Sequence, residues 1–178
     1  MGTQSDFLVS LAKSTGQVDF EAVYRAELPR VYNFFRYRLG DDQTAEDLTA
    51  ETFEKAWRHR ERYRSDLASF STWLFTIARR VATDHFRKRR PTFPLDEAEQ
   101  LSNAQTLEET AQERTDFAHL SVLLARLAER ERELVALKYG AGLTNRAIAR
   151  ISGLSESNVS TILSRVTHQL RAQLENEP

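Results

Sequence analysis

The chain has 178 residues, enough for one large domain or two small ones. It contains no cysteine, which excludes a disulfide framework, a thiolate zinc site and a cysteine nucleophile. The four histidines lie far apart and share no ligand spacing, so neither a metal site nor a cofactor is expected. No apolar run approaches the roughly 20 residues that cross a bilayer, and a cytoplasmic location is expected.

The net charge of −1 conceals a strong alternation along the chain. Its four blocks are residues 1–53 with −4, 54–90 with +7, 91–118 with −6 and 119–178 with +2. The basic block creates a positive field that can attract a phosphate backbone. The alternative is a solvated helix face that happens to be rich in arginine.

The acidic block predicts a linker over residues 91–116, because two prolines open it and few large apolar residues follow. A short helix from Leu107 to Glu113 would fit inside it. The expected order is therefore an N-terminal extension over 1–17, a helical domain over 18–90, the linker, and a second helical domain over 117–175.

Apolar periodicity predicts three helices in the first domain. The first begins near Phe20 and stops at Gly40, with a kink or restart at Pro29. The second begins around Thr44, where Asp47 completes a weak capping box. Its apolar side is Ala45, Leu48, Thr52 and Ala56, and an acidic stripe of Asp47, Glu51 and Glu54 lies elsewhere on it.

The third helix is expected to start at an N-cap, Ser71, and to reach about Lys88. Its expected buried face is Leu74, Ile77, Ala78, Val81 and His85, which leaves the basic residues exposed. The connection before it mixes arginines with aromatic rings, a pattern that suits single-stranded nucleic acid. The alternative is that Trp73 and Phe86 belong to the core.

In the second domain, Leu120–Leu127 and Leu134–Tyr139 predict two amphipathic helices, and a helix-turn-helix follows them. Thr144 caps its first helix, Gly153 makes the turn, and Ser155 caps the second helix. The exposed face of that helix, Ser157, Asn158, Ser160, Thr161, Ser164 and Arg165, carries groups that can reach base edges in a major groove, while Arg146 and Arg150 would meet the DNA backbone. The alternative is a tight helical hairpin with no role in DNA binding.

Three motifs then stand in order along the chain. The chain resembles the extracytoplasmic-function sigma factors, the small two-domain members of the sigma-70 family, over about residues 18–175. AEDLTAETFEKAWRHRERY (45–63) is similar to their region 2.2, FSTWLFTIARRVATDHFRKRR (70–90) to regions 2.3 and 2.4, and LLARLAERERELVALKYGAGLTNRAIARISGLSESNVSTILSRV (123–166) to region 4.

The resemblance implies a non-catalytic subunit that binds core RNA polymerase, directs it to promoters and helps to melt the duplex. Asp47, Glu51 and Glu54 would dock on the polymerase, and the Arg64–Phe70 loop would capture a flipped base of the minus-10 element. The minus-10 contacts would be Arg64, Ser65, Phe70, Trp73, Arg79, Arg80, Thr83, Arg87 and Lys88. The minus-35 contacts would be Arg146, Ser157, Asn158, Ser160, Thr161, Ser164 and Arg165.

Two departures from the family pattern concern specificity. Arg80 stands where the family often has asparagine, which affects base choice at the minus-10 element. The recognition helix reads SNVSTIL over 157–163 where a run such as GTVKSRL is usual, so it lacks two basic residues. Minus-35 binding is then weak, unusual in sequence or supported by another protein.

Other readings remain open at this point. In one variant of the sigma-factor interpretation, an anti-sigma factor or an accessory protein controls the chain. The first 17 residues would then be a contact segment for that protein, and the alternative is a frayed terminus. A helix-turn-helix regulator would instead need a ligand pocket or a self-complementary face in its first half. A nucleic-acid enzyme would need convergent carboxylates, and Asp66 and Asp84 are isolated among basic residues.

Overall fold

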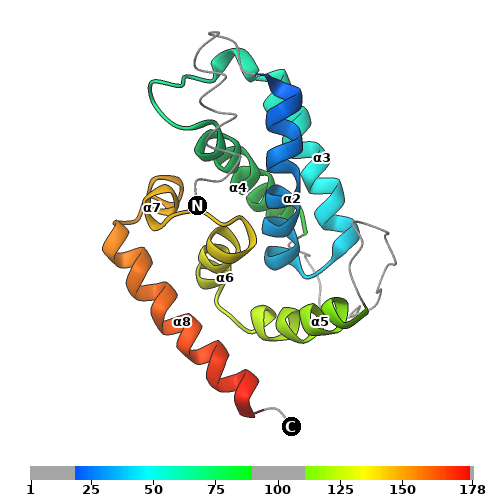
Figure 1. Ribbon diagram of the computed structural model, residues 1–178, viewed down its shortest axis with the longest axis vertical. Coiled ribbons are helices and arrows are strands. Elements are labelled where there is room, and N and C mark those ends of the chain that lie inside the picture. The colour runs from blue at the N-terminus through cyan, green and yellow to red at the C-terminus, as the bar shows by residue number, and fades with distance from the viewer. Residues whose placement is uncertain (1–18, 90–110, 177–178) are drawn as a thin grey trace. The chain divides into compact units, whose positions relative to one another are not determined.

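The computed structural model describes residues 19–89 and 111–176, and these residues form helices and short turns with no strand among them (Figure 1). The expected all-α fold is therefore confirmed. The extension over 1–17 and most of the expected linker lie outside the described residues. Residues 111–116, which the linker prediction included, already belong to a helix. The division into domains at 18–90 and 117–175 stays a prediction.

The chain divides into two compact units. Among the described residues, the first unit holds 19–32 and 46–89, and the second holds 33–45 and 111–176. Two helices, α2 (Phe20–Leu39) and α3 (Asp42–Arg58), contribute residues to both units.

Three helices build the first unit: α2, α3 and α4 (Phe70–Arg89), with a 3-10 turn, η1 (Arg60–Arg62), after α3. Their buried apolar side chains include Phe53, Leu74 and Phe75. A buried carboxylate, Glu27 on α2, accepts from Arg30 at 2.8 Å and from the Ser71 hydroxyl of α4 at 3.4 Å. Burial of a carboxylate is tolerated where such partners surround it, and here they join α2 to α4.

The helix boundaries confirm the stop at Gly40, exclude a restart at Pro29 and correct the expected start of the second helix. α2 runs through Pro29 as one helix and stops before Gly40, whose φ of +73° suits glycine. α3 starts at Asp42, because the Asp41 carboxylate caps it by accepting from the Thr44 backbone N–H at 2.8 Å; the expected capping box at Thr44 is wrong.

The start of α4 differs in the same way. Its cap is Ser69, whose hydroxyl accepts from the Thr72 backbone N–H at 3.2 Å, whereas Ser71 turns its hydroxyl toward Glu27. On the expected buried face, Leu74, Ala78 and Val81 are buried, but Ile77 and His85 are only half-buried. Phe75 and Ala82 are buried there instead.

The second unit contains α5 (Ala111–Ala125), α6 (Glu129–Val135), a π-helical turn η2 (Ala136–Gly140), α7 (Asn145–Ser152) and α8 (Glu156–Asn176). Leu134, Val135 and Leu137 are buried as expected, but Tyr139 is exposed. Gly140 is buried so closely that a Cβ there would lie 2.8 Å from the backbone oxygen of Asn33. That approach explains why the position takes glycine.

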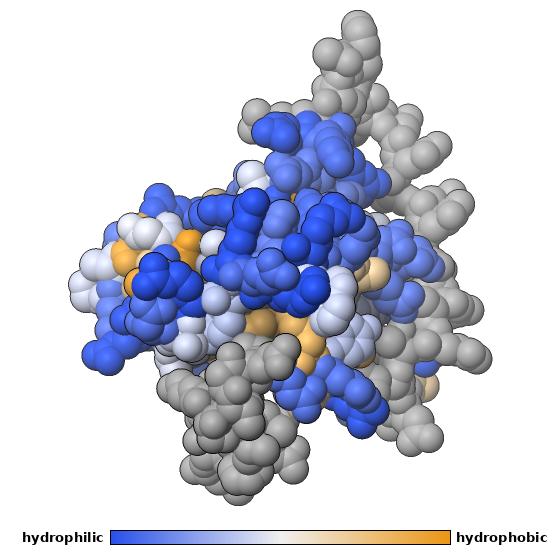
Figure 2. Space-filling model, turned by 90° about the horizontal axis from the view of Figure 1, so that it is seen from above, coloured by the Kyte–Doolittle hydropathy of each residue, from blue (hydrophilic) through white to orange (hydrophobic). Residues whose placement is uncertain are grey.

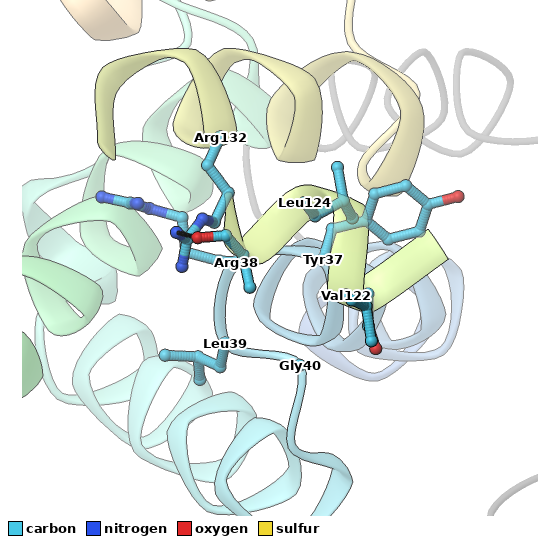
Figure 3. Close-up of a pocket in the computed structure, with 9 residues that line it drawn as sticks. Tyr37, Arg38, Leu39, Gly40, Val122, Leu124 and Arg132 are labelled. Atoms are coloured by element: carbon cyan, nitrogen blue, oxygen red, sulfur yellow. Dashed lines mark hydrogen bonds between the residues drawn. The ribbon is translucent and has the colours of Figure 1, made fainter. Parts of the chain in front are cut away.

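A buried arginine, Arg38, is part of the same unit. Its guanidinium donates to the backbone oxygen of Glu129 at 3.1 Å and to the Glu129 carboxylate at 3.3 Å. Burial lowers the pKa of Arg38, while the nearby carboxylates of Glu133 and Glu129 act in the opposite direction. A cavity of about 200 Å³ lies beside it. Figure 3 shows Arg38 and Arg132 toward one side of its lining and Tyr37 and Val122 toward the other. The carboxylates that match Arg38 leave little local excess of positive charge.

Hydrophilic side chains cover most of the face seen in Figure 2, where apolar groups show only as small separate areas. Within residues 19–89 and 111–176, no helix is both long enough and apolar enough to span a membrane.

Candidate protein and nucleic-acid interfaces

The acidic face of α3, defined as Asp47, Glu51 and Glu54, lies away from the buried side of this helix. That buried side is the expected set of Ala45, Leu48, Thr52 and Ala56. Two of the three carboxylates carry a cation one turn further along: Lys55 Nζ lies 2.7 Å from Glu51 Oε1, and Arg58 bonds Glu54. The acidic face is therefore partly neutralised by its own helix.

Trp57, which the sequence reasoning did not select, lies near one end of this face and is 53% exposed. The Arg60 guanidinium carbon lies 4.3 Å from the centroid of its indole ring, and the Phe20 ring meets it edge-on at 5.0 Å. An arginine over an indole ring is a cation–π arrangement. The sequence could have indicated Trp57, because it follows Glu54 by three residues and therefore lies near the same side of the helix.

An aromatic cluster lies where η1 leads into α4. Phe70 is 2% exposed, and its ring touches those of Phe20, Tyr63 and Trp73 at centroid distances of 5.8, 5.3 and 5.3 Å. Its burial leaves little of the ring accessible to a base in this arrangement, and the expected DNA contact by Phe70 stays a prediction. Tyr63 and Trp73 are half-buried, and their ring centroids lie 5.4 Å apart. Burial raises the pKa of the Tyr63 hydroxyl.

The loop over residues 63–69 connects η1 to α4. Arg64 and Asp66 form an ion pair at 2.7 Å, and this bond raises the pKa of Arg64 and lowers that of Asp66. Ser65, also expected to contact DNA, is exposed. Tyr63 donates from its hydroxyl to the backbone oxygen of Ala68 at 3.2 Å, which closes the loop.

The basic face of α4 is defined by Arg79, Arg80, Thr83, Arg87 and Lys88. All five lie on one helix, as expected; Arg79 is half-buried and the other four are exposed. Arg87 pairs with Asp84 at 3.1 Å, but its side chain remains 76% exposed. The face therefore presents its charge to solvent, as a surface for a phosphate backbone requires.

The helix-turn-helix is formed by α7 and α8. The Thr144 hydroxyl accepts from the Ala147 backbone N–H at 3.2 Å, and the Ser155 hydroxyl accepts from that of Asn158 at 3.2 Å, so both expected caps are present. Gly153 makes the turn with a φ of +75°. On the inner side of α8, Val159, Leu163 and Val166 are buried.

The outer side of α8 carries the expected reading face. Ser157, Asn158, Ser160, Thr161, Ser164 and Arg165 are all exposed, and so is Arg146 on α7. Both arginines meet a carboxylate: Arg165 lies 2.7 Å from Glu131 of α6, and Arg146 lies 3.8 Å from Glu156. Sequence reasoning missed Glu131, because 34 residues separate it from Arg165 and no local pattern joins them.

Comparison with known protein families shows which family the chain belongs to. The model of sigma-70 region 2 matches residues 23–92, and the model of sigma-70 region 4 matches residues 123–172. The chain belongs to the sigma-70 family. It is an RNA polymerase sigma factor of the extracytoplasmic-function type, a protein that binds the core enzyme and directs it to promoter DNA.

Curated relatives carry the same description. The chain is 31% identical to the sigma factor BldN of Streptomyces coelicolor, over 91% of this chain and 63% of the relative. It is 32% identical to SigC of Mycobacterium tuberculosis, over 93% and 86% of the two chains. It is 27% identical to SigM of Bacillus subtilis, over 85% and 93%. This sigma factor thus spans about two thirds of BldN and most of the other two.

Solved structures show the same fold at lower identity. The sigma factor RpoE of Bartonella quintana, in complex with the anti-sigma factor NepR, matches with a TM-score of 0.72 and 22% identity, over 90% of this chain and 99% of that one. CnrH in complex with the cytosolic domain of CnrY matches with a TM-score of 0.66 and 22% identity, over 99% and 100%.

Proposed function

We propose that this sigma factor divides its work among three surfaces: the acidic face of α3 docks on core polymerase, the basic face of α4 with the 63–69 loop holds the minus-10 element, and α8 reads the minus-35 element. The observation that carries the proposal is the opposite charge of two exposed helix faces in one unit. An acidic face makes an unfavourable surface for DNA, whereas the basic face of α4 makes a favourable one.

Docking through α3 requires an exchange of ion pairs. Glu51 and Glu54 are paired with Lys55 and Arg58 at i,i+4 spacing on a solvent-exposed surface. Such pairs contribute only about 0.3–0.5 kcal/mol each. Basic side chains of the polymerase could therefore replace them at little cost, and Asp47 adds a third carboxylate to the contact.

Opening of the minus-10 element requires a place for an unstacked base. Extruding a base costs a few kcal/mol, and base–aromatic stacking returns about 1–3 kcal/mol per base. Tyr63 and Trp73 are half-buried rings at the two ends of the loop, and both contact the buried Phe70 ring. We assign stacking to those two rings, and backbone contact to Arg64, Arg79, Arg80, Thr83, Arg87 and Lys88.

Reading of the minus-35 element falls to α8. Asn158 can pair with adenine and Arg165 with guanine or a phosphate, since both are exposed on one helix that fits a major groove. The remaining exposed residues are short hydroxyls, which add contacts to bases or phosphates. We further propose that the chain has no catalytic activity of its own, works in the cytoplasm, and is held inactive by an anti-sigma factor, because the two similar solved sigma factors are complexes, and one of these holds an anti-sigma factor.

The test of the docking surface is charge reversal of Asp47, Glu51 and Glu54 to lysine. The variant should lose co-purification with core polymerase while its far-UV circular dichroism and melting temperature stay close to those of the wild type. The matched control reverses Glu113 and Asp116, two exposed carboxylates of α5, and should retain binding. Full binding by the α3 variant would remove α3 from the proposed interface.

A further inference from the structure

The 63–69 loop is closed by its own hydrogen bonds. The backbone N–H groups of Leu67 and Ala68 both donate to the Arg64 carbonyl oxygen, at 3.1 and 3.3 Å, and the Tyr63 hydroxyl holds the Ala68 carbonyl. The Arg64–Asp66 ion pair spans the same turn. Several bonds within seven residues give the loop tip one defined conformation.

That tip presents an apolar side chain to solvent. Leu67 is 66% exposed, more than any other large apolar side chain among the described residues. A single exposed leucine is ordinary on a protein surface, so exposure alone indicates nothing. What sets Leu67 apart is its place, in a closed turn one residue from an ion-paired Asp66 and beside the ring cluster of Tyr63 and Trp73.

The chemistry of strand opening supplies a use for this side chain. When one base leaves a duplex, its neighbours lose a stacking partner, and an apolar side chain such as leucine can fill the gap. Leucine carries no hydrogen-bonding group, so it would favour the opened state without reading sequence. The buried Phe70 ring contacts Tyr63 and Trp73 and so anchors both ends of the loop to the core.

We propose that Leu67 is a wedge, which enters the base stack of the minus-10 element and occupies the space left by the flipped base. The inference rests on the proposed minus-10 role of the loop and adds a residue outside the expected contacts. The arginines around the loop would hold the backbone while the wedge acts, so binding and melting become separable functions of one surface.

The experiment compares Leu67→Ala with the wild type on two forms of one promoter, chosen from start sites mapped by run-off transcription. One form is fully paired, and the other carries a mismatched bubble over the minus-10 element. Loss of the leucine side chain should slow initiation on the paired form on the order of tenfold, and the bubble should restore it to the wild-type rate. Leu67→Met should stay near the wild type on both.

The controls separate the possible failures. Leu174→Ala removes an exposed leucine near the end of α8 and should change neither template. Equal loss by Leu67→Ala on both templates, or no loss on either, would overturn the wedge. Failure of the wild-type protein to support initiation on any template would refute the proposed function itself, and the wedge with it. Core-polymerase binding by Leu67→Ala should equal that of the wild type, since a loss there would show a docking residue instead.

Discussion

The ion pair between Arg165 and Glu131 gives a quantitative prediction for minus-35 binding. The two side chains lie 2.7 Å apart, with 64% and 22% of their surfaces exposed. An exposed pair of this kind contributes about 0.2–1 kcal/mol. Arg165 must give up this pair to reach DNA, so Glu131→Gln should tighten holoenzyme binding to a minus-35 duplex about 1.5- to 5-fold.

The measurement is fluorescence anisotropy of a labelled minus-35 duplex titrated with holoenzyme at several salt concentrations. Arg165→Ala should weaken binding at least about fivefold, because one good base or phosphate contact contributes about 1–3 kcal/mol. In the Arg165→Ala background, Glu131→Gln should no longer tighten binding. The control Glu175→Gln also removes one negative charge, but about 15 Å from Arg165 along α8. That distance exceeds the screening length of roughly 8–10 Å, so the control should have little effect on binding. If Glu131→Gln tightened DNA binding equally in the wild-type and Arg165→Ala backgrounds, the effect would not come from the Arg165–Glu131 pair but from the general change in charge.

Three other changes test the fold and the site. Ser69→Ala removes the cap that holds the Thr72 N–H of α4 and should lower the melting temperature by about 2–4 °C, the effect of roughly 1 kcal/mol; an unchanged melt followed by circular dichroism would contradict the cap. Gly140→Ala places a Cβ 2.8 Å from the Asn33 carbonyl oxygen and should cost about 1–3 kcal/mol in urea unfolding, whereas wild-type stability would show that the backbone gives way. Arg80→Asn should change the preferred minus-10 base in run-off transcription from a library of promoter variants, with core binding intact; an unaltered preference would exclude Arg80 from base choice.

The parts of the fold that the sequence predicts well are those determined by local periodicity. The buried side of α3 and both caps of the helix-turn-helix follow from spacing and from residue types that satisfy orphan N–H groups. The helix starts at Asp42 and Phe70 were missed because several polar residues there could serve as a cap. Which one does depends on where its neighbours point: Ser71 is drawn toward Glu27 on α2, so Ser69 caps α4.

The parts that the sequence could not supply are contacts between distant residues. The sequence alone suggests that Phe70 is a DNA-contacting ring at the end of a basic loop. In the structure it is buried against Phe20 of α2, Tyr63 of the loop and Trp73, one turn further along α4. In the sequence, Glu131 is one of several acidic residues of α6. Only the structure shows that it pairs with Arg165 of α8. Tyr139 fits a helical apolar pattern, but the π-helical turn η2 changes the angular spacing of that segment and leaves the side chain exposed.

The three proposed surfaces share a property that affects how they bind: each carries counter-charges of its own. On each surface a residue expected to meet a partner already holds an ion pair exposed to solvent. These pairs are Glu54 with Arg58, Arg87 with Asp84, and Arg165 with Glu131. At these residues binding exchanges pairs instead of creating them, so the salt dependence of promoter binding should be shallower than a count of the arginines implies. If the proposed roles hold, a large share of affinity and selectivity should come from contacts that no internal pair offsets: the stacking rings, the Leu67 side chain and the uncharged residues of the reading face of α8.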